Sequence, residues 1–403
     1  MIETRRSASK AGDVVPAFTG SRLTLARHLA GYRKSDLARL LGKSATAVAA
    51  WESGTKRPTA STIAELALCL SVDPWFFAAR GSDAAAASSA AHFRSLRSTT
   101  QLGRDQAEAY GRIAVDIADV LHRHVEFPEP DVPSYPVDVN DRDLAEAGAA
   151  ARLVRDTWGL GHGPMRHLVR LLENHGVLVV FSPTQSSSVD AYSFVVGERP
   201  VIILNPVKRD YYRQRFDAAH ELGHLVMHGD AEPGSRTVEE HAHAFAAELL
   251  MPAREIETLL PVVMNTRSWH TLAQLKEQWG VSMQALLYRA RQLGRLGDVS
   301  YRNAMTTINT RGWRRHEPGL ITTIEQPSLL PRTLELLDKE GIDIEKIITD
   351  CAMPRHLFEI ATSRAPLATS TESDGNPAAE SRTSVVSLLD LHGDHEPDRP
   401  RTE

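Results

Sequence analysis

Two histidines four residues apart give the most specific chemical signal in this sequence of 403 residues. They are His220 and His224 in the run RFDAAHELGH, and Glu221 follows the first of them. On an α-helix, positions four apart differ by about 40° around the axis and about 6 Å along it, so both imidazoles project from one face. Two such imidazoles suit one zinc ion, and a neighbouring carboxylate suits a base that accepts a proton from water. The pattern predicts a Zn²⁺ site with His220 and His224 as ligands and Glu221 as the catalytic base.

A catalytic zinc site needs a third protein ligand, and a second predicted helix, over residues 238–250, offers one. It carries Glu239, fifteen residues after the second histidine, and His243, four residues further on the same face. We expect Glu239 to be the third ligand and His243 to hydrogen-bond a ligand histidine. Glu240 is the competing ligand. Glu248, on the same helix, is expected to be a solvated residue.

Other side chains near these helices have less specific roles. His228 repeats the four-residue spacing, but on a straight helix it lies about 12 Å from His220 and cannot share one ion with it. We expect it to end the helix or to support a ligand histidine. Hydrolysis also needs a group that stabilises the oxyanion, a contribution of about 3 kcal/mol. Tyr192, Tyr288 and Arg289 are the candidates, although the last two could equally be core and surface residues of their helix.

The N-terminal residues 21–80 are predicted to form five short helices, and the second and third of these make a helix-turn-helix. The second starts at Lys34, a tight turn follows at Gly42, and Ser44 caps the third. This arrangement presents the third helix to the DNA major groove. Because that helix is rich in alanine, which offers base edges no hydrogen bond, we expect mainly phosphate contacts. The candidate DNA-binding residues are Lys34, Lys43, Ser44, Thr46, Lys56 and Arg57.

Charge and composition agree with a DNA partner at this end. Residues 1–80 contain 12 Lys and Arg against 6 Asp and Glu, whereas the whole chain has a net charge of −5. A basic head indicates a polyanion such as double-stranded DNA. Only Cys69 and Cys351 are present, too few for a disulfide framework or a cysteine-based zinc site. The first fifteen residues lack an apolar signal, and no apolar run approaches the roughly 20 residues of a membrane span, so we expect a cytoplasmic protein with no membrane partner.

The N-terminal module resembles the Xre/phage-repressor family over about sixty residues. The resemblance rests on the segments LARLLG, AVAAWESG and LALCL. It implies an ion pair between Arg27 and Glu52 that holds the first helix against the third.

The segments RFDAAHELGHLVMH, VEEHAHAFAAELLMP and LKEQWGVSMQALLYRA resemble the ImmA/IrrE metallopeptidase family. The resemblance covers about residues 150–305 and continues more weakly to about residue 360. It implies that the histidine pair and Glu239 bind zinc and that Glu221 is the base. The family commonly has an asparagine where His243 stands. Many relatives also begin with an Xre-type domain.

These observations together predict a mainly α (α+β) fold. Three β-like segments, at residues 177–181, 191–196 and 201–205, should form a small sheet among many helices. The resemblance implies that the sheet belongs to a zincin-like domain. The predicted division is a five-helix helix-turn-helix domain (1–80), a linker and connecting helix (81–137), a metallopeptidase domain (138–305), a helical C-terminal region (306–367) and a disordered tail (368–403).

The predicted function is zinc-dependent hydrolysis of a peptide bond inside a protein substrate, coupled to transcriptional regulation. The resemblance implies a partner repressor or an antitoxin-like regulator as the substrate. One alternative is a DNA-binding regulator whose zinc domain is a sensor, and another is a protease toxin of a toxin–antitoxin system. Glu221 favours an enzyme, because a structural zinc site does not need that carboxylate. The sequence leaves room for a homodimer.

Overall fold

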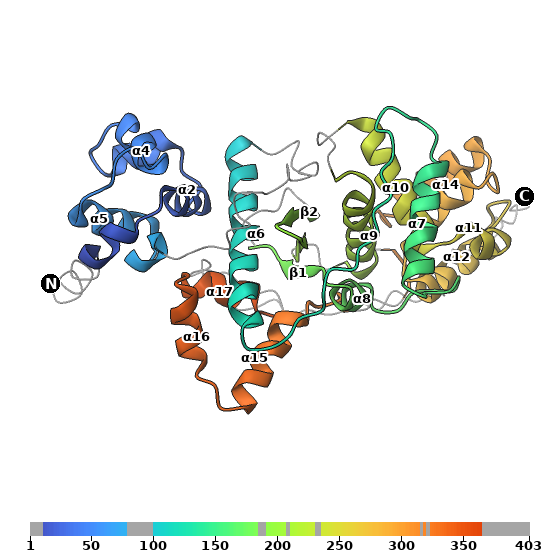
Figure 1. Ribbon diagram of the computed structural model, residues 1–403. Helices are drawn as coiled ribbons and strands as arrows, with labels where there is room; N and C mark the ends of the chain where they lie inside the picture. The colour runs from blue at the N-terminus through green and yellow to red at the C-terminus, as the bar shows by residue number, and fades with distance from the viewer. Residues whose placement is uncertain are drawn as a thin grey trace, which may run out of the picture.

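The computed structural model describes residues 11–78, 100–183, 191–206, 210–229, 235–314, 317–319 and 323–364. Within them the chain is mainly helical and contains one three-stranded sheet (Figure 1), so the expected α+β fold is confirmed. None of the described helices is both long enough and apolar enough to cross a membrane. The predicted tail over residues 368–403 lies outside the described residues.

The N-terminal bundle contains the expected helix-turn-helix. Gly42, with a φ of 62°, makes the turn, and the Ser44 hydroxyl caps the next helix by accepting a hydrogen bond from the backbone N–H of Ala47. The fifth expected helix is a short 3-10 helix, capped by Asp73. The elements are η1 (Val15–Ala17), α2 (Gly20–Leu29), α3 (Lys34–Leu40), α4 (Ala45–Glu52), α5 (Ala60–Leu70) and η2 (Pro74–Phe77).

The sheet consists of β1 (Leu178–Phe181), β2 (Ala191–Val196) and β3 (Arg199–Leu204) in the order β1-β3-β2. The central strand β3 is parallel to β1 and antiparallel to β2, with Ser193 opposite Ile202. All three strands match the predicted segments. Their side chains alternate between two hydrophobic cores, one on each face of the sheet.

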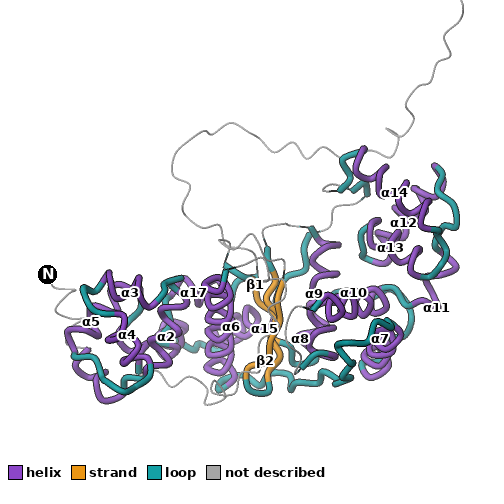
Figure 2. The backbone as a smooth tube through the Cα atoms, turned by 90° about the horizontal axis from the view of Figure 1, so that it is seen from above, coloured by secondary structure: helices purple, strands orange, loops and turns teal. Residues whose placement is uncertain are grey.

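Helix α6 (Gln101–His122) covers one face of the sheet, and α9 (Tyr211–Met227) lies against the other (Figures 1 and 2). Gly111 allows the close approach of α6, because a Cβ there would lie 1.8 Å from the ring of Phe194. Helix α10 (Arg236–Leu250) packs on α9. The sheet is therefore sandwiched between helices, and β2 runs beside the helix that carries the histidine pair.

Further helices complete the core on the α9 side. Helix α7 begins only at Ala145, because the carboxylates of Asp141 and Asp143 accept hydrogen bonds from the backbone two residues on and form turns. These helices are α7 (Ala145–Thr157), α8 (Leu168–Asn174), α11 (Ala253–Ile256), η4 (Glu257–Leu259), α12 (Thr266–Trp279), α13 (Met283–Gln292) and α14 (Asp298–Thr310).

The last helices return to the other side of the sheet and share a core with α6 and the N-terminal bundle. They are α15 (Leu329–Lys339), α16 (Ile344–Cys351) and α17 (Arg355–Ala361).

Arg22 of α2 fixes the N-terminal bundle against α6. Its buried guanidinium donates hydrogen bonds to the carbonyl of Phe76 at 3.1 Å and to Asp116 of α6 at 2.5 Å. Gln106 of α6 donates to the carbonyl of Leu29 at 2.9 Å. Helix α6, which belongs to the predicted connecting segment, thus contacts both the bundle and the sheet.

Candidate metal centre

Helix α9 presents both histidines of the sequence motif on one face. Asp210 caps the helix by accepting hydrogen bonds from the backbone N–H groups of Tyr212 and Arg213. The Nε2 atoms of His220 and His224 lie 3.1 Å apart, so both rings turn the same nitrogen toward a common point. His224 is 1% exposed, which keeps this point close to the protein interior.

Glu239 of α10 completes the group. Its Oε2 lies 3.2 Å from Nε2 of His220, and its Oε1 lies 3.4 Å from Nε2 of His224. Gly223 allows α10 to approach α9 this closely, because a Cβ there would come within 2.9 Å of the Phe245 ring. Among the described residues, this is the group of histidine and carboxylate side chains placed to hold a metal ion.

The spacing of these ligand atoms fits zinc. Zinc bonds of about 2.0–2.2 Å to nitrogen and oxygen place tetrahedral ligands roughly 3.3–3.5 Å apart. The two histidine Nε2 atoms lie 3.1 Å apart, close to that value, and each of them has one oxygen of the Glu239 carboxylate at 3.2 or 3.4 Å. Two imidazoles and one carboxylate are also a donor set that catalytic zinc uses, with a fourth position open.

The structure brings Glu239, and not the competing Glu240, to the histidine pair. The side chain of Glu240 is 45% exposed and accepts a hydrogen bond from Arg236 at 2.7 Å. That hydrogen bond lowers the pKa of the Glu240 carboxyl. The two residues diverge because neighbouring positions on a helix point about 100° apart.

Glu221 is buried beside the candidate metal site and is held by a residue that the sequence analysis missed. The hydroxyl of Ser193, on β2, donates a hydrogen bond to Oε2 of Glu221 at 2.7 Å. Ser193 is fully buried on the face of the sheet that contacts α9. The sequence signal that could have identified it is a single serine among apolar residues in the predicted strand AYSFVV.

Two further histidines, His243 and His228, lie next to the candidate ligand histidines. His243 donates from Nδ1 to the carbonyl of Glu239 at 2.9 Å, and its ring centroid lies 4.6 Å from that of His220. His228 instead has its Nδ1 3.1 Å from Nδ1 of His224. The expectation that His243 hydrogen-bonds a ligand histidine therefore stays a prediction, whereas His228 contacts a ligand histidine.

Two of the oxyanion candidates have other partners. Tyr192 points to the opposite side of the sheet, where its hydroxyl donates to the carbonyl of Ala107 on α6. Arg289 is buried and pairs with Glu248, and it also donates to the carbonyl of Met251 at 3.1 Å. The expectation that Glu248 is solvated was wrong, because this ion pair between α10 and α13 buries it. Tyr288 is half-buried, and burial raises the pKa of its phenol.

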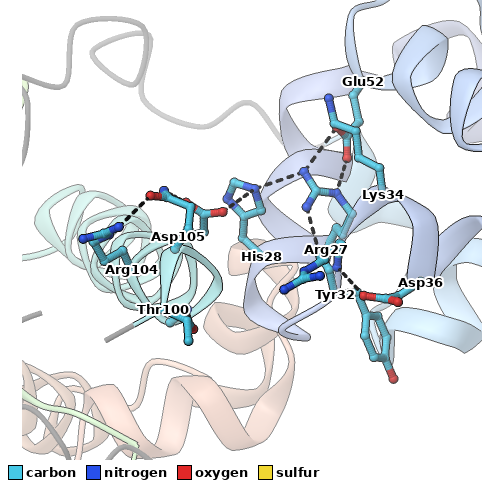
Figure 3. Close-up of polar contacts among 12 residues, drawn as sticks. Arg27, His28, Tyr32, Lys34, Asp36, Glu52, Thr100, Arg104 and Asp105 are labelled. Carbon is cyan, nitrogen blue, oxygen red and sulfur yellow. Dashed lines mark hydrogen bonds and ion pairs between the residues drawn. The ribbon is translucent and has the colours of Figure 1, made fainter. Parts of the chain in front are cut away.

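The six candidate DNA-binding residues are all exposed on the helix-turn-helix. Arg27 pairs with Glu52 at 2.6 Å, as the resemblance implied (Figure 3). Nζ of Lys34 lies 3.3 Å from the same carboxylate, so part of its charge is already balanced. The remaining candidates lie on α4 and the turns around it. They are Lys43, Ser44, Thr46, Lys56 and Arg57.

Two models of known protein families match this chain, one over the N-terminal bundle and one over the part that holds the candidate metal centre. Residues 24–74 match a family model described as helix-turn-helix, and residues 172–291 match the IrrE N-terminal-like domain. The radiation response metalloprotease IrrE of Deinococcus deserti is 32% identical over 159 residues, which cover 36% of this chain and 50% of that protein. The chain thus spans about half the length of this curated relative. The predicted resemblance is confirmed: this chain is similar to ImmA/IrrE-family metallopeptidases and carries an Xre-type helix-turn-helix domain at its N-terminal end.

Proposed function

We propose that this protein is a zinc-dependent endopeptidase coupled to a DNA-binding domain. The observation that carries the proposal is the cluster of His220, His224 and Glu239, whose ligand atoms lie within 4.8 Å of one another, with the Glu221 carboxylate buried next to them. The match to the IrrE N-terminal-like domain and the similarity to a metalloprotease support the same reading.

His220, His224 and Glu239 would hold the ion. A bound zinc ion would supply Lewis-acid polarisation of the scissile carbonyl and would make water more acidic. Glu221 accepts the proton of the attacking water and passes it to the leaving amine. Ser193 keeps the Glu221 carboxylate oriented for both proton transfers, because its hydroxyl donates a hydrogen bond to Oε2 at 2.7 Å. This division leaves Glu221 outside the ligand set and available for proton transfer.

We further propose double-stranded DNA and a protein substrate as partners. The helix-turn-helix match and the exposed basic residues support DNA binding. The resemblance to the ImmA/IrrE family favours a partner repressor or antitoxin-like regulator as the substrate. The buried contact of Arg22 with Asp116 ties the DNA-binding bundle to α6 and thereby to the sheet beside the active site.

Metal analysis of the purified full-length chain tests the proposal. We expect about one zinc per chain in the wild type and a loss of that zinc in His220→Ala and His224→Ala. His356→Ala provides the control, because this exposed histidine belongs to α17, on the far side of the sheet. Zinc retained by both ligand variants, or a wild-type chain that binds none, would contradict the assignment.

A further inference from the structure

We propose that His228 and His241 form, with the ligand histidine His224, a chain of packed imidazoles: His224 donates a hydrogen bond to His228, and His241 packs against His228 and is anchored on the backbone carbonyl of Asp141. In this chain His228 and His241 are positioning residues that fix the ring of His224 for zinc. The inference rests on the proposed zinc site and concerns how that site is held. It involves the end of α9, the second turn of the next helix α10, and the turn before α7, which lies 100 residues before His241.

The first contact sets the direction of the chain. If Nε2 of His224 binds zinc, that atom supplies a lone pair, and the neutral ring must carry its proton on Nδ1. Nδ1 of His228 lies 3.1 Å from Nδ1 of His224, so it accepts a hydrogen bond from the Nδ1–H group of His224. His228 must then carry its own proton on Nε2. Its Nδ1 cannot be protonated without placing two N–H groups against each other.

The contact of His241 with the Asp141 carbonyl fixes the tautomer of His241. Nε2 of His241 lies 2.8 Å from the carbonyl oxygen of Asp141, which can only accept, so His241 carries its proton on Nε2. Its Nδ1 is therefore an acceptor. This atom is buried and has no hydrogen-bond partner among the described residues. The ring of His241 lies parallel to that of His228, with centroids 5.9 Å apart and an interplanar angle of 12°.

Each contact thus fixes the tautomer of one ring: the His224 contact places the proton of His228 on Nε2, and the Asp141 contact places the proton of His241 on Nε2. Burial of the three rings keeps these tautomers fixed. The exposed fractions of His224, His228 and His241 are 1%, 1% and 0%, so bulk water cannot replace a lost partner. A zinc-bound histidine that donates its other N–H to a fixed acceptor keeps its orientation and becomes a stronger ligand. We therefore assign the acceptor role to His228, and the role of packing against it to His241.

The tautomers can be read in the wild-type chain without any substitution. A two-bond ¹H–¹⁵N correlation spectrum of the zinc-loaded, full-length protein should show His224 protonated on Nδ1 and both His228 and His241 protonated on Nε2. Single substitutions, used only for assignment, identify the signals. A His228 ring protonated on Nδ1, or a doubly protonated His228 at neutral pH, would overturn the proposal.

Zinc affinity provides the second measurement. His228→Phe fills the same space but removes the acceptor, and we expect the zinc dissociation constant to rise about 10–100-fold in competition with a chromophoric chelator. His228→Asn can still place an acceptor near Nδ1 and should stay within about threefold of the wild type. His241→Leu should produce a smaller rise than His228→Phe.

His175→Phe is the matched control. This half-buried histidine stacks on Trp158 at 4.2 Å, so its replacement perturbs packing without touching the chain of imidazoles. Its zinc affinity should equal that of the wild type. If the wild type binds zinc and His228→Phe binds it equally well, the positioning role is wrong while the zinc site stands. If the wild type binds no zinc, the proposed function itself fails.

Discussion

The Glu221 carboxylate and the Ser193 hydroxyl meet inside the protein, next to the three candidate zinc ligands. In the proposed mechanism this carboxylate binds no metal and transfers protons. The hydrogen bond from the Ser193 hydroxyl fixes Oε2 of this carboxylate. At the scale of single residues, three functions are therefore separate: the candidate ligands bind the metal, Glu221 transfers protons, and Ser193 orients Glu221.

Replacing Glu221 by glutamine tests the proton-transfer role. The amide keeps the shape and the hydrogen bond but loses the basic oxygen, so cleavage should fall about 10²–10⁴-fold while zinc content stays unchanged. Processing of the partner regulator in cells, followed by immunoblot, provides the measurement. Glu240→Gln is the control, because that exposed carboxylate pairs with Arg236 outside the site. Normal processing by Glu221→Gln would mean that the zinc domain acts as a sensor and not as a peptidase.

The Ser193→Ala substitution tests orientation of the base. A hydrogen bond to a charged group contributes about 1.5–3 kcal/mol, which corresponds to about a 10–100-fold loss of activity if the bond is needed at the transition state. Zinc content should not change. Ser182→Ala is the matched control: this buried serine follows β1, and its hydroxyl has no hydrogen-bond partner among the described residues. Equal activity of the two variants would remove Ser193 from the mechanism.

At the scale of elements, two pairs of helices determine what the protein can do. Helices α9 and α10 bring the three candidate zinc ligands together, and their close contact depends on Gly223, which lies against the Phe245 ring. Helices α3 and α4 form the helix-turn-helix, whose outer face presents lysine, arginine and small side chains. Since alanine contributes little to base recognition, this face should bind DNA mainly through its phosphates.

Salt dependence of DNA binding tests that expectation. The affinity of the full-length chain for duplex DNA should fall steeply with salt concentration, because each phosphate contact releases condensed cations. Lys43→Gln should weaken binding to all sequences similarly and reduce the slope of log affinity against log salt by about one. Lys339→Gln removes the same charge from an exposed site on α15 and should leave the slope unchanged. A chain that binds no DNA at low salt would make the bundle a protein-docking module.

At the scale of the whole molecule, the DNA-binding bundle is integrated with the peptidase-like part. Helix α6 has the bundle on one side and the sheet on the other, and α15–α17 close the same core (Figures 1 and 2). His28 lies where α2 meets α6, with its Nε2 3.0 Å from Nη2 of Arg27 and 3.7 Å from Oδ2 of Asp105 (Figure 3). The guanidinium can only donate, so this ring is held in its neutral form.

The stability of this junction should therefore depend on pH. Burial, and then the charge of Arg27, lowers the pKa of His28; Lys34 acts in the same direction, while Asp105 and Glu52 oppose it. A depressed pKa favours the neutral ring in the folded state, so its stabilising contribution is present above the ordinary pKa of about 6.5 and is lost as pH falls through the folded value. The unfolding free energy of the wild type should fall more between pH 7.5 and 5 than that of His28→Gln.

Urea denaturation of both proteins at the two pH values measures this difference. His356→Gln, at an exposed position of α17, should behave as the wild type does. An equal loss of stability in the wild type and in His28→Gln would show that protonation of His28 does not destabilise the contact between α2 and α6.

The sequence by itself determined the features that depend on local geometry. The helix repeat places His220 and His224 on one face, and the alternating apolar residues of the three strands follow from the pleat. The glycine turn and the serine cap likewise define the helix-turn-helix from a few neighbouring residues.

Only the tertiary structure decided which distant side chains meet. Glu239 and Glu240 are adjacent in the sequence, and the packing of α10 on α9 selected the first. Ser193 lies 28 residues before Glu221, and the edge position of β2 beside α9 brought them together. Glu248 was expected in solvent because the sequence could not show that Arg289 reaches it from α13. Such contacts depend on how whole elements pack, and a periodic pattern fixes the face of an element but not its neighbour.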